Sequence, residues 1–240
     1  MRPGGADVSL RQILRRVPFA RSTWQLAREL RPLLFHDAAR ARADYEEEFA
    51  RTRDPWAFET DPVAGRDRFA CELAMLDAVR GDRPFRRALE VGCAEGMFTE
   101  LLAPRCERLV AVDISSIALA RARDRCAWGS HVQFSEWDLR TDAVAGPFDL
   151  VVIEGVLDCF SQPWAFRAAR DKLVTALVPG GYLLAGNPRS TPIIEGAWWG
   201  RYLRRGGKWI DAYLAEHPCL SVESSAREPT YVDTLFRKRA

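Results

Sequence analysis

The feature that most constrains the fold is a glycine loop that joins an apolar strand to a helix. Residues 88–99 read Ala-Leu-Glu-Val-Gly-Cys-Ala-Glu-Gly-Met-Phe-Thr, so a strand ends in Gly92 and a helix opens at Gly96. Asp113 ends the next apolar run, 21 residues after Gly92. In doubly wound folds ligands bind beyond the carboxyl ends of the strands, where an acid can accept hydrogen bonds from ribose hydroxyls. The spacing therefore predicts a nucleoside site between the loop and Asp113.

From Arg86 onward, short apolar runs alternate with helical patterns. Such alternation is typical of an α/β fold with a parallel sheet covered by helices on both faces. Two β-like runs close the chain with no helix between them and indicate an antiparallel hairpin at the end of the sheet. The predicted strands are 87–91, 109–112, 132–135, 149–153, 181–186, 220–224 and 231–237, and the predicted helices are 66–80, 96–103, 115–127 and 164–177.

The residues of the loop also indicate the kind of nucleotide. A dinucleotide fingerprint requires glycines that let a pyrophosphate approach a helix N-terminus. Ala94 and Met97 replace two of these glycines, and Glu95 adds negative charge where phosphate would lie. A cofactor with a cationic centre and no phosphate is compatible with both Glu90 and Glu95. S-adenosylmethionine (SAM) has both properties.

Composition excludes several other classes of protein. The 240 residues include 35 basic and 33 acidic side chains, a formal net charge of +2 that disfavours wholesale binding of polyanions. Apolar runs do not exceed four residues, so we expect neither a transmembrane helix nor a secretory signal. The six cysteines form no C-x-x-C pair and the three histidines are scattered, so we expect no metal site and a reduced, cytoplasmic protein.

Residues 88–187 resemble a class I SAM-dependent methyltransferase. Besides the glycine loop, the resemblance lies in Val-Ala-Val-Asp-Ile-Ser (110–115), Trp-Asp-Leu (137–139), Phe-Asp-Leu-Val-Val-Ile-Glu-Gly-Val-Leu (148–157) and Leu-Val-Pro-Gly-Gly-Tyr-Leu (177–183). It implies a Rossmann-like sheet of seven mostly parallel strands in which the last strand is antiparallel. It also implies SAM as cofactor and S-adenosylhomocysteine (SAH) as product.

Within that class, residues 44–180 are similar to the nodulation protein S (NodS) group of small-molecule N-methyltransferases. The motifs that carry this similarity are Tyr-Glu (45–46), Asp-Pro-Trp (54–56), Gly-Met-Phe-Thr (96–99) and Ala-Pro-Arg-Cys (103–106). The Tyr-Glu-x-x-Lys element usual in that group is replaced here by Gly-Arg-Asp-Arg-Phe (65–69).

The resemblance implies a role for each residue of the cofactor site. Gly92 and Ala94 would hold the methionyl portion above Glu90, and Gly96 would allow close approach of the backbone. The residues expected at the nucleoside are Asp113 for the ribose, Ile114 and Leu139 for the adenine ring, and Asp138 for the adenine amino group. A turn cap is the alternative role of Asp138.

Glu154 and Gly155 end the fourth predicted strand, beside the expected position of the donor methyl group. Glu154 and Asp158 are the candidate catalytic residues, because a carboxylate can orient an amine acceptor. A helix cap is the alternative role of Glu154. Tyr45 and Trp56 either close over the sulfonium as a lid or pack a helical cap on the sheet.

We expect residues 1–85 to form a helical N-terminal arm and lid, and residues 86–240 to form the methyltransferase domain. An acceptor-site insertion is predicted at about 188–216, where aromatic residues either line the acceptor pocket or pack in the core. They are Trp198, Trp199, Tyr202, Trp209 and Tyr213. The arm carries nine arginines within residues 1–43 and could also join two copies of the chain as a homodimer.

These features favour transfer of a methyl group to a small-molecule acceptor, with an amine nitrogen of an amino sugar or other specialised metabolite as the preferred target. The preference for nitrogen follows from the resemblance alone. O-methylation of a natural-product or sugar hydroxyl is the main alternative. An RNA-directed methyltransferase that uses the basic arm, and a non-catalytic SAM-binding protein, are less favoured alternatives.

Overall fold

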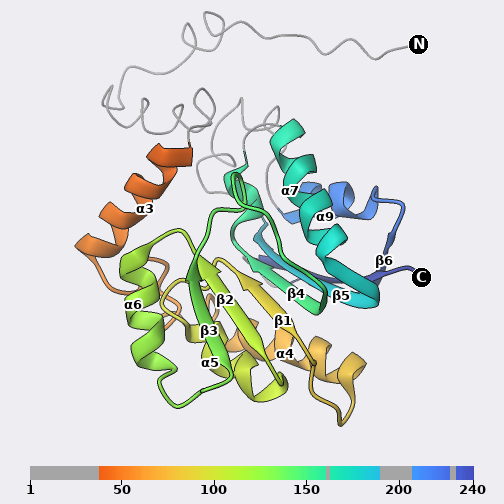
Figure 1. Cartoon of the computed structure of the whole chain (residues 1–240), viewed down its shortest axis with the longest axis horizontal. Helices are drawn as coiled ribbons and strands as arrows, with labels where there is room; N and C mark the ends of the chain where they lie inside the picture. The colour runs from red at the N-terminus through yellow and green to blue at the C-terminus, as the bar shows by residue number, and fades with distance from the viewer. Residues whose placement is uncertain (1–37, 161–162, 190–206, 228–230) are drawn as a thin grey trace, which may run out of the picture.

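The computed structural model describes residues 38–160, 163–189, 207–227 and 231–240 (Figure 1). In this part of the chain, seven strands form one sheet in the order β3-β2-β1-β4-β5-β7-β6. The strands are β1 Ala88–Val91, β2 Leu109–Asp113, β3 Val132–Glu136, β4 Phe148–Glu154, β5 Leu177–Pro188, β6 Leu220–Arg227 and β7 Tyr231–Lys238. The helices are α3 Ala38–Arg51, α4 Arg66–Arg80, α5 Met97–Leu102, α6 Ser116–Arg125, α7 Pro163–Ala176 and α9 Gly207–Ala215, with 3₁₀ turns at Ala103–Arg105 and Leu157–Cys159.

Strands β1 to β5 run parallel, and β7 inserts antiparallel between β5 and β6. This arrangement confirms the predicted Rossmann-like sheet with its antiparallel last strand. Val91 pairs with both Val112 and Ile153, so the carboxyl ends of β1, β2 and β4 meet at one edge. The order of strands places β2 and β4 on opposite sides of β1, and the chain therefore diverges there, as ligand binding requires.

The predicted strand 181–186 is the element whose bounds differ most from the structure, whereas the predicted helix 164–177 differs from α7 by one residue at each end. The helix α7 ends at Ala176 and β5 already begins at Leu177, which pairs with Phe148. An irregularity in the pairing of β4 with β5 accommodates the Pro-Gly-Gly sequence 179–181, where Gly180 has φ 80°. Proline and glycine favour a turn in the sequence, although the strand continues past them in the structure.

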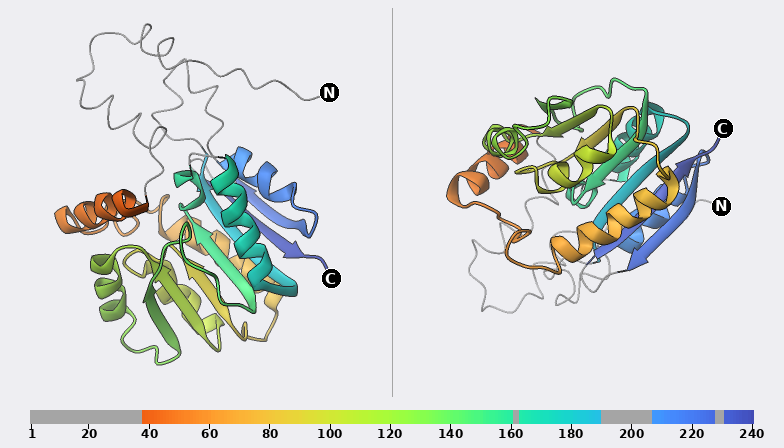
Figure 2. Two further views of the ribbon diagram at one scale, coloured as in Figure 1. Left: turned by 45° about the horizontal axis from the view of Figure 1, so that its top comes forward. Right: turned by 90° about the horizontal axis from the view of Figure 1, so that it is seen from below.

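Helices cover both faces of the sheet. One apolar cluster joins α4 and α5 to the sheet through Phe69, Leu76, Phe98 and Leu102, and it includes Leu150 of β4. The opposite face carries α7 and α9 (Figure 1). The helix α4, which the predicted boundary at residue 85 assigns to the arm, packs against this sheet (Figure 2). Burying these side chains completely stabilises the fold by about 1.5–3 kcal/mol each.

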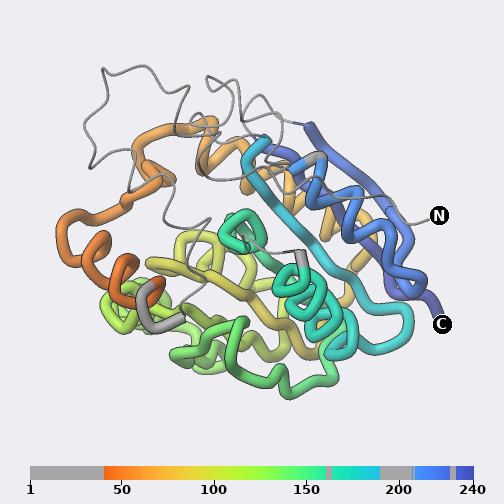
Figure 3. Tube along the Cα trace, turned by 90° about the horizontal axis from the view of Figure 1, so that it is seen from above, coloured from red at the N-terminus to blue at the C-terminus, as the bar shows by residue number. Residues whose placement is uncertain are grey.

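The helix α3 lies beside α6 at the edge of the molecule (Figure 3). Glu46 of α3 accepts hydrogen bonds from the Ser115 hydroxyl at 2.8 Å and from the backbone N–H of Ser116 at 2.7 Å. These groups form the N-terminus of α6, whose free N–H groups and dipole favour a carboxylate. Residues 1–37 of the predicted arm lie outside the described residues, and the homodimer suggested for the arm stays a prediction. No helix in the described ranges combines the length and apolarity that a membrane span needs.

Candidate functional site

The glycine loop lies where the sequence places it, between β1 and α5. Gly92 and Gly96 have φ values of 82° and 80°, a region that side chains disfavour. A Cβ atom at Gly96 would lie 3.0 Å from Ala122 of α6, so the glycine allows the close packing of loop and helix. Ala94 also has a positive φ of 47°. Backbone strain of this kind is concentrated at functional sites and is maintained by the surrounding contacts.

Asp113 provides the contact that holds this loop. Its Oδ2 accepts the N–H of Ala94 at 2.9 Å, and its Oδ1 accepts the N–H of Ser115 at 2.9 Å. Each carboxylate oxygen keeps a second lone pair for a ligand hydroxyl. Burial raises the pKa of Asp113, and the hydrogen bonds from Ser115 and Ala94 oppose that rise. The acid predicted from spacing therefore joins β2, the loop and α6 in one network at the edge of a cavity.

Glu95 has a different position from the one that the sequence suggests. The structure does not place it along the cavity; it is 5 % exposed and forms an ion pair with Arg121 at 2.5 Å. Its other oxygen accepts the N–H of Asp54 at 2.9 Å. The charge of Glu95 is thus compensated by Arg121, and its repulsion of a pyrophosphate is weaker than the sequence alone indicates. Its carboxylate instead fixes the Asp-Pro-Trp turn on the loop.

Asp138 and Leu139 line the cavity beyond the end of β3, as expected for the adenine side. Both carboxylate oxygens of Asp138 also accept hydrogen bonds from the Arg140 guanidinium at 2.8 Å. Burial alone would raise the pKa of Asp138, but Arg140 lowers it below its usual value. Lys172 of α7 donates to the carbonyls of Leu139 and Asp142 at 2.9 Å. Asp138 therefore stabilises this turn, which agrees with the alternative role as a turn cap, and it also lines the cavity; its contact with the adenine amino group stays a prediction.

Tyr45 and Trp56 meet above the cavity, with their ring centroids 6.3 Å apart, and both line it. Trp56 packs edge-on against Phe49 at 5.1 Å and remains 38 % exposed. The Tyr45 hydroxyl lies 2.9 Å from the Sγ atom of Cys159 across the cavity. The two aromatic residues therefore have the position that a lid needs, and they also pack the α3 segment.

One cavity collects residues from the ends of β1, β2 and β4 and from the α3 segment. From the predicted cofactor and catalytic set, it is lined by Tyr45, Trp56, Gly92, Ala94, Asp113, Ile114, Asp138, Leu139, Glu154, Gly155 and Asp158. Residues of the site that the sequence analysis did not identify include Phe49, Phe58, Arg68, Trp137, Arg140 and Tyr231. Gly96 is not among the lining residues; it acts by letting the loop pack on α6.

A smaller cavity lies under the loop, lined by Glu90 together with Gly92, Cys93 and Ala94. Glu90 is 2 % exposed, and burial raises its pKa to about 8, with the charge of Asp113 adding to the rise. A buried acid that holds a proton at neutral pH can release it when a cation arrives, because an opposite charge favours the ionised form. Glu90 thus lies beneath the glycine loop, and its contact with the methionyl amino group stays a prediction.

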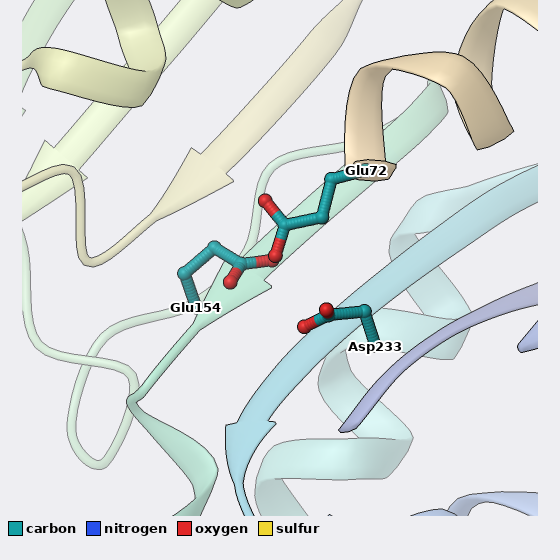
Figure 4. A group of neighbouring side chains, drawn as sticks. All are labelled: Glu72, Glu154 and Asp233. Carbon is teal, nitrogen blue, oxygen red and sulfur yellow. The ribbon is translucent and has the colours of Figure 1, made fainter. Parts of the chain in front are cut away.

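Glu154, Glu72 and Asp233 converge at the floor of the cavity from β4, α4 and β7, with carboxylate oxygens within 4.8 Å of one another (Figure 4). Arg68, the second arginine of the Gly-Arg-Asp-Arg-Phe segment, contacts all three carboxylates and is itself 1 % exposed. The positive charge at this carboxylate cluster is thus the guanidinium of Arg68. Glu154 forms an ion pair with Arg68 and does not act as the helix cap that was its alternative role.

Among the aromatic residues predicted after Pro188, Trp209 and Tyr213 are described and Trp198, Trp199 and Tyr202 are not. Trp209 and Tyr213 pack 4.6 Å apart, and both contact the ring of Phe166 in the core under α7. They do not line the cavity. Core packing, one of the two roles considered, is therefore confirmed for these two residues.

The fold and the cavity can be compared with those of solved structures. A crystal structure of the N-methyltransferase NodS from Bradyrhizobium japonicum in complex with SAH superposes with a TM-score of 0.72 at 29 % identity, covering 83 % of this chain and 98 % of that one. The fold is therefore the Rossmann-like fold of methyltransferases.

The family follows from the sequence comparison. The profile of the family "Nodulation protein S (NodS)" matches residues 40–203, and the chain belongs to this family. Curated relatives include nodulation protein S of Sinorhizobium fredii, 37 % identical over 56 % of this chain and 60 % of the relative. The protein of the same name from Bradyrhizobium diazoefficiens is 38 % identical over 57 % of this chain and 63 % of the relative. The chain thus spans about three-fifths of the length of these relatives.

Proposed function

We propose that the protein is a SAM-dependent methyltransferase that acts on the nitrogen of a small-molecule amine in the cytoplasm. The single observation that carries the proposal is the network of Asp113, which ties the loop at Ala94 to the start of α6 beside a cavity. A nucleoside whose ribose binds Asp113 would extend its sulfur toward Glu154 and its adenine toward Leu139. The related NodS protein, an N-methyltransferase crystallised in complex with SAH, supports the same cofactor and nitrogen as acceptor.

The reaction needs little chemistry from the protein. A nucleophilic nitrogen displaces the sulfur from the methyl carbon of SAM, and the products are the methylated amine and SAH. The donor is already activated, so alignment and exclusion of water supply most of the acceleration. Glu154 and Asp158 line the cavity where a carboxylate would accept a proton from an incoming ammonium group. Tyr45 and Trp56 would cover the reacting atoms from the α3 side.

The direct experiment is an assay with methyl-labelled SAM and pairs of acceptors that differ in one group, such as glucosamine with glucose and hexylamine with hexanol. We expect label in the amines and none above background in the alcohols. Label in the alcohols alone would favour O-methylation, the main alternative. The absence of transfer to every acceptor, together with tight binding of SAH, would favour a SAM-binding protein without catalytic activity.

Glu90 gives a prediction that does not depend on the acceptor. Because burial raises its pKa to about 8, Glu90 is protonated at pH 7 in the free protein. The ammonium group of SAH would favour the carboxylate, so binding is expected to release about one proton at pH 7 and to tighten as pH rises toward 8. Calorimetry in buffers of different ionisation enthalpy measures this release. We expect Glu90→Gln to abolish it, and unchanged release in that variant would contradict the placement of the amino group.

A further inference from the structure

We propose that Arg68 is a positioning residue that fixes the carboxylate of Glu154 at the wall of the cavity where the donor methyl group would lie. This inference rests on the proposed function. Neither residue 68 nor its partners in the core, Glu72 and Asp233, belong to the cofactor site implied by the family resemblance.

The guanidinium of Arg68 contacts three carboxylates through Nε and Nη2 and an aromatic ring through one face. Nη2 contacts the Oε2 atom of Glu154. Nε lies 2.9 Å from Oε1 of Glu72 and 3.5 Å from Oδ1 of Asp233. The Tyr231 ring covers one face, with its centroid 3.9 Å from Cζ. A planar guanidinium with fixed donors can hold several carboxylates at defined angles, which a flexible ammonium group cannot do. Arg68 thus has one geometry, and Glu154 receives its position from it.

This cluster is costly, which argues for a role beyond stability. Taking each ion out of water is unfavourable, and apolar side chains of similar size often stabilise a core as well or better. Burial raises the pKa of Glu72 well above its usual value, which is the expected consequence of that cost. The absence of a side chain at Gly186 of β5 makes room for Glu154, because a Cβ atom at Gly186 would lie 2.1 Å from Oε2 of Glu154. The neighbouring strand thus leaves space for this carboxylate.

The carboxylate of Glu154 can bind a ligand in addition to its contact with Arg68. Its side chain is 10 % exposed and lines the cavity. Its Oε2 atom contacts the Arg68 guanidinium as an ion pair, and neither Oε1 nor Oε2 has a hydrogen-bond partner of good geometry among the described residues. A buried carboxylate oxygen without a hydrogen-bond partner destabilises the protein, and an incoming N–H donor would remove that cost. The guanidinium on one side therefore leaves the other oxygen for the acceptor nitrogen.

Sinefungin tests this arrangement without an identified acceptor. It replaces the methylated sulfur of SAM by a carbon that carries an amine, so its ammonium group reports on the position of the methyl group. The measured quantity is the ratio of the dissociation constants of SAH and sinefungin, obtained by calorimetry. We expect Glu154→Gln to lower this ratio about tenfold through loss of a charged hydrogen-bond partner. Arg68→Lys keeps the charge but cannot hold Glu154 and Glu72 together, and we expect it to lower the ratio about fivefold.

The double variant decides whether Arg68 acts through Glu154. In the Glu154→Gln background, Arg68→Lys should change the ratio by less than about twofold, because the group that it positions is gone. Gly186→Ala is a second variant that tests the position of Glu154. Its added Cβ atom displaces the Glu154 side chain while residue 68 remains arginine. It should lower the ratio as Arg68→Lys does, including when Arg68→Lys fails to fold. The matched control is Arg105→Lys, which alters a bidentate ion pair with Asp77. Neither residue lines the cavity, so this variant should leave the ratio unchanged.

Two results would overturn the inference while SAH still binds. One is a ratio within twofold of the wild type in both Arg68→Lys and Gly186→Ala. The other is an equal effect of Arg68→Lys with Glu154 present and absent, because a merely structural role would act in both backgrounds. If the wild type binds neither SAH nor sinefungin, the proposed function itself is wrong, and this inference falls with it.

Discussion

Replacing Gly92 by alanine is expected to abolish measurable SAH binding and to destabilise the protein. The added Cβ would lie 2.3 Å from Cγ2 of Val156 and 3.4 Å from the carbonyl oxygen of Glu154, and φ is 82°. A side chain in that backbone region costs about 1–2 kcal/mol. Overpacking against the end of β4 adds about 1–3 kcal/mol, or the loop moves and the cavity wall moves with it. Denaturant unfolding and calorimetry with SAH measure the two effects.

The control for this variant is Gly180→Ala. Gly180 has almost the same φ, 80°, but an added Cβ there meets nothing within 4 Å. It should show the backbone cost alone and bind SAH as the wild type does. Adding Val156→Ala to Gly92→Ala removes the nearest contact and should recover part of the stability. If Gly92→Ala bound SAH within about threefold of the wild type, the loop could not be the wall of the cofactor site.

Replacing Asp113 by alanine is expected to weaken SAH binding about 10-fold to 100-fold. Loss of hydrogen bonds to buried ribose hydroxyls costs about 1–3 kcal/mol, and each 1.4 kcal/mol is a factor of ten. The variant also frees the N–H of Ala94, which Asp113 accepts at 2.9 Å, so the loop loses its support on the same side. Asp113→Asn keeps the size and one acceptor oxygen and should be intermediate. Calorimetry with SAH measures all three proteins.

Asp124→Ala is the matched control, because Asp124 is an exposed aspartate of the neighbouring helix α6. It should bind SAH as the wild type does. A change of less than twofold in Asp113→Ala would contradict the assignment of the ribose site, whatever the effect on stability.

The loop and Asp113 could be predicted from the sequence because both depend on local signals. Glycine at a strand end marks a backbone that needs positive φ, and a fixed number of residues separates consecutive parallel strands. The roles of Glu95 and Asp138 depend on partners that spacing does not reveal. Arg121 compensates Glu95 from a helix 26 residues away, and Arg140 occupies both oxygens of Asp138. The acidic residues near the site could therefore be predicted, but the arginines that neutralise their charge could not.

The Arg68 cluster could not be predicted because it assembles three distant segments. Arg68 and Glu72 are four residues apart on α4, and this spacing alone indicates an ordinary surface pair. A signal was present in β7, where Asp233 interrupts a run of buried residues and is itself fully buried. An acid in such a run is rarely tolerated without a partner. Only the order of strands, which brings β7 next to β5 and near α4, identifies that partner.

We propose that the crevice at the ends of β1 and β2 binds the nucleoside and amino-acid portions shared by SAM and SAH and excludes a dinucleotide. The most direct measurement is a pair of calorimetric titrations of the full chain, one with SAH and one with NAD. We predict saturable binding of SAH with one site per chain and no heat of binding from NAD at the same concentrations. Saturable binding of NAD with none of SAH would contradict this claim.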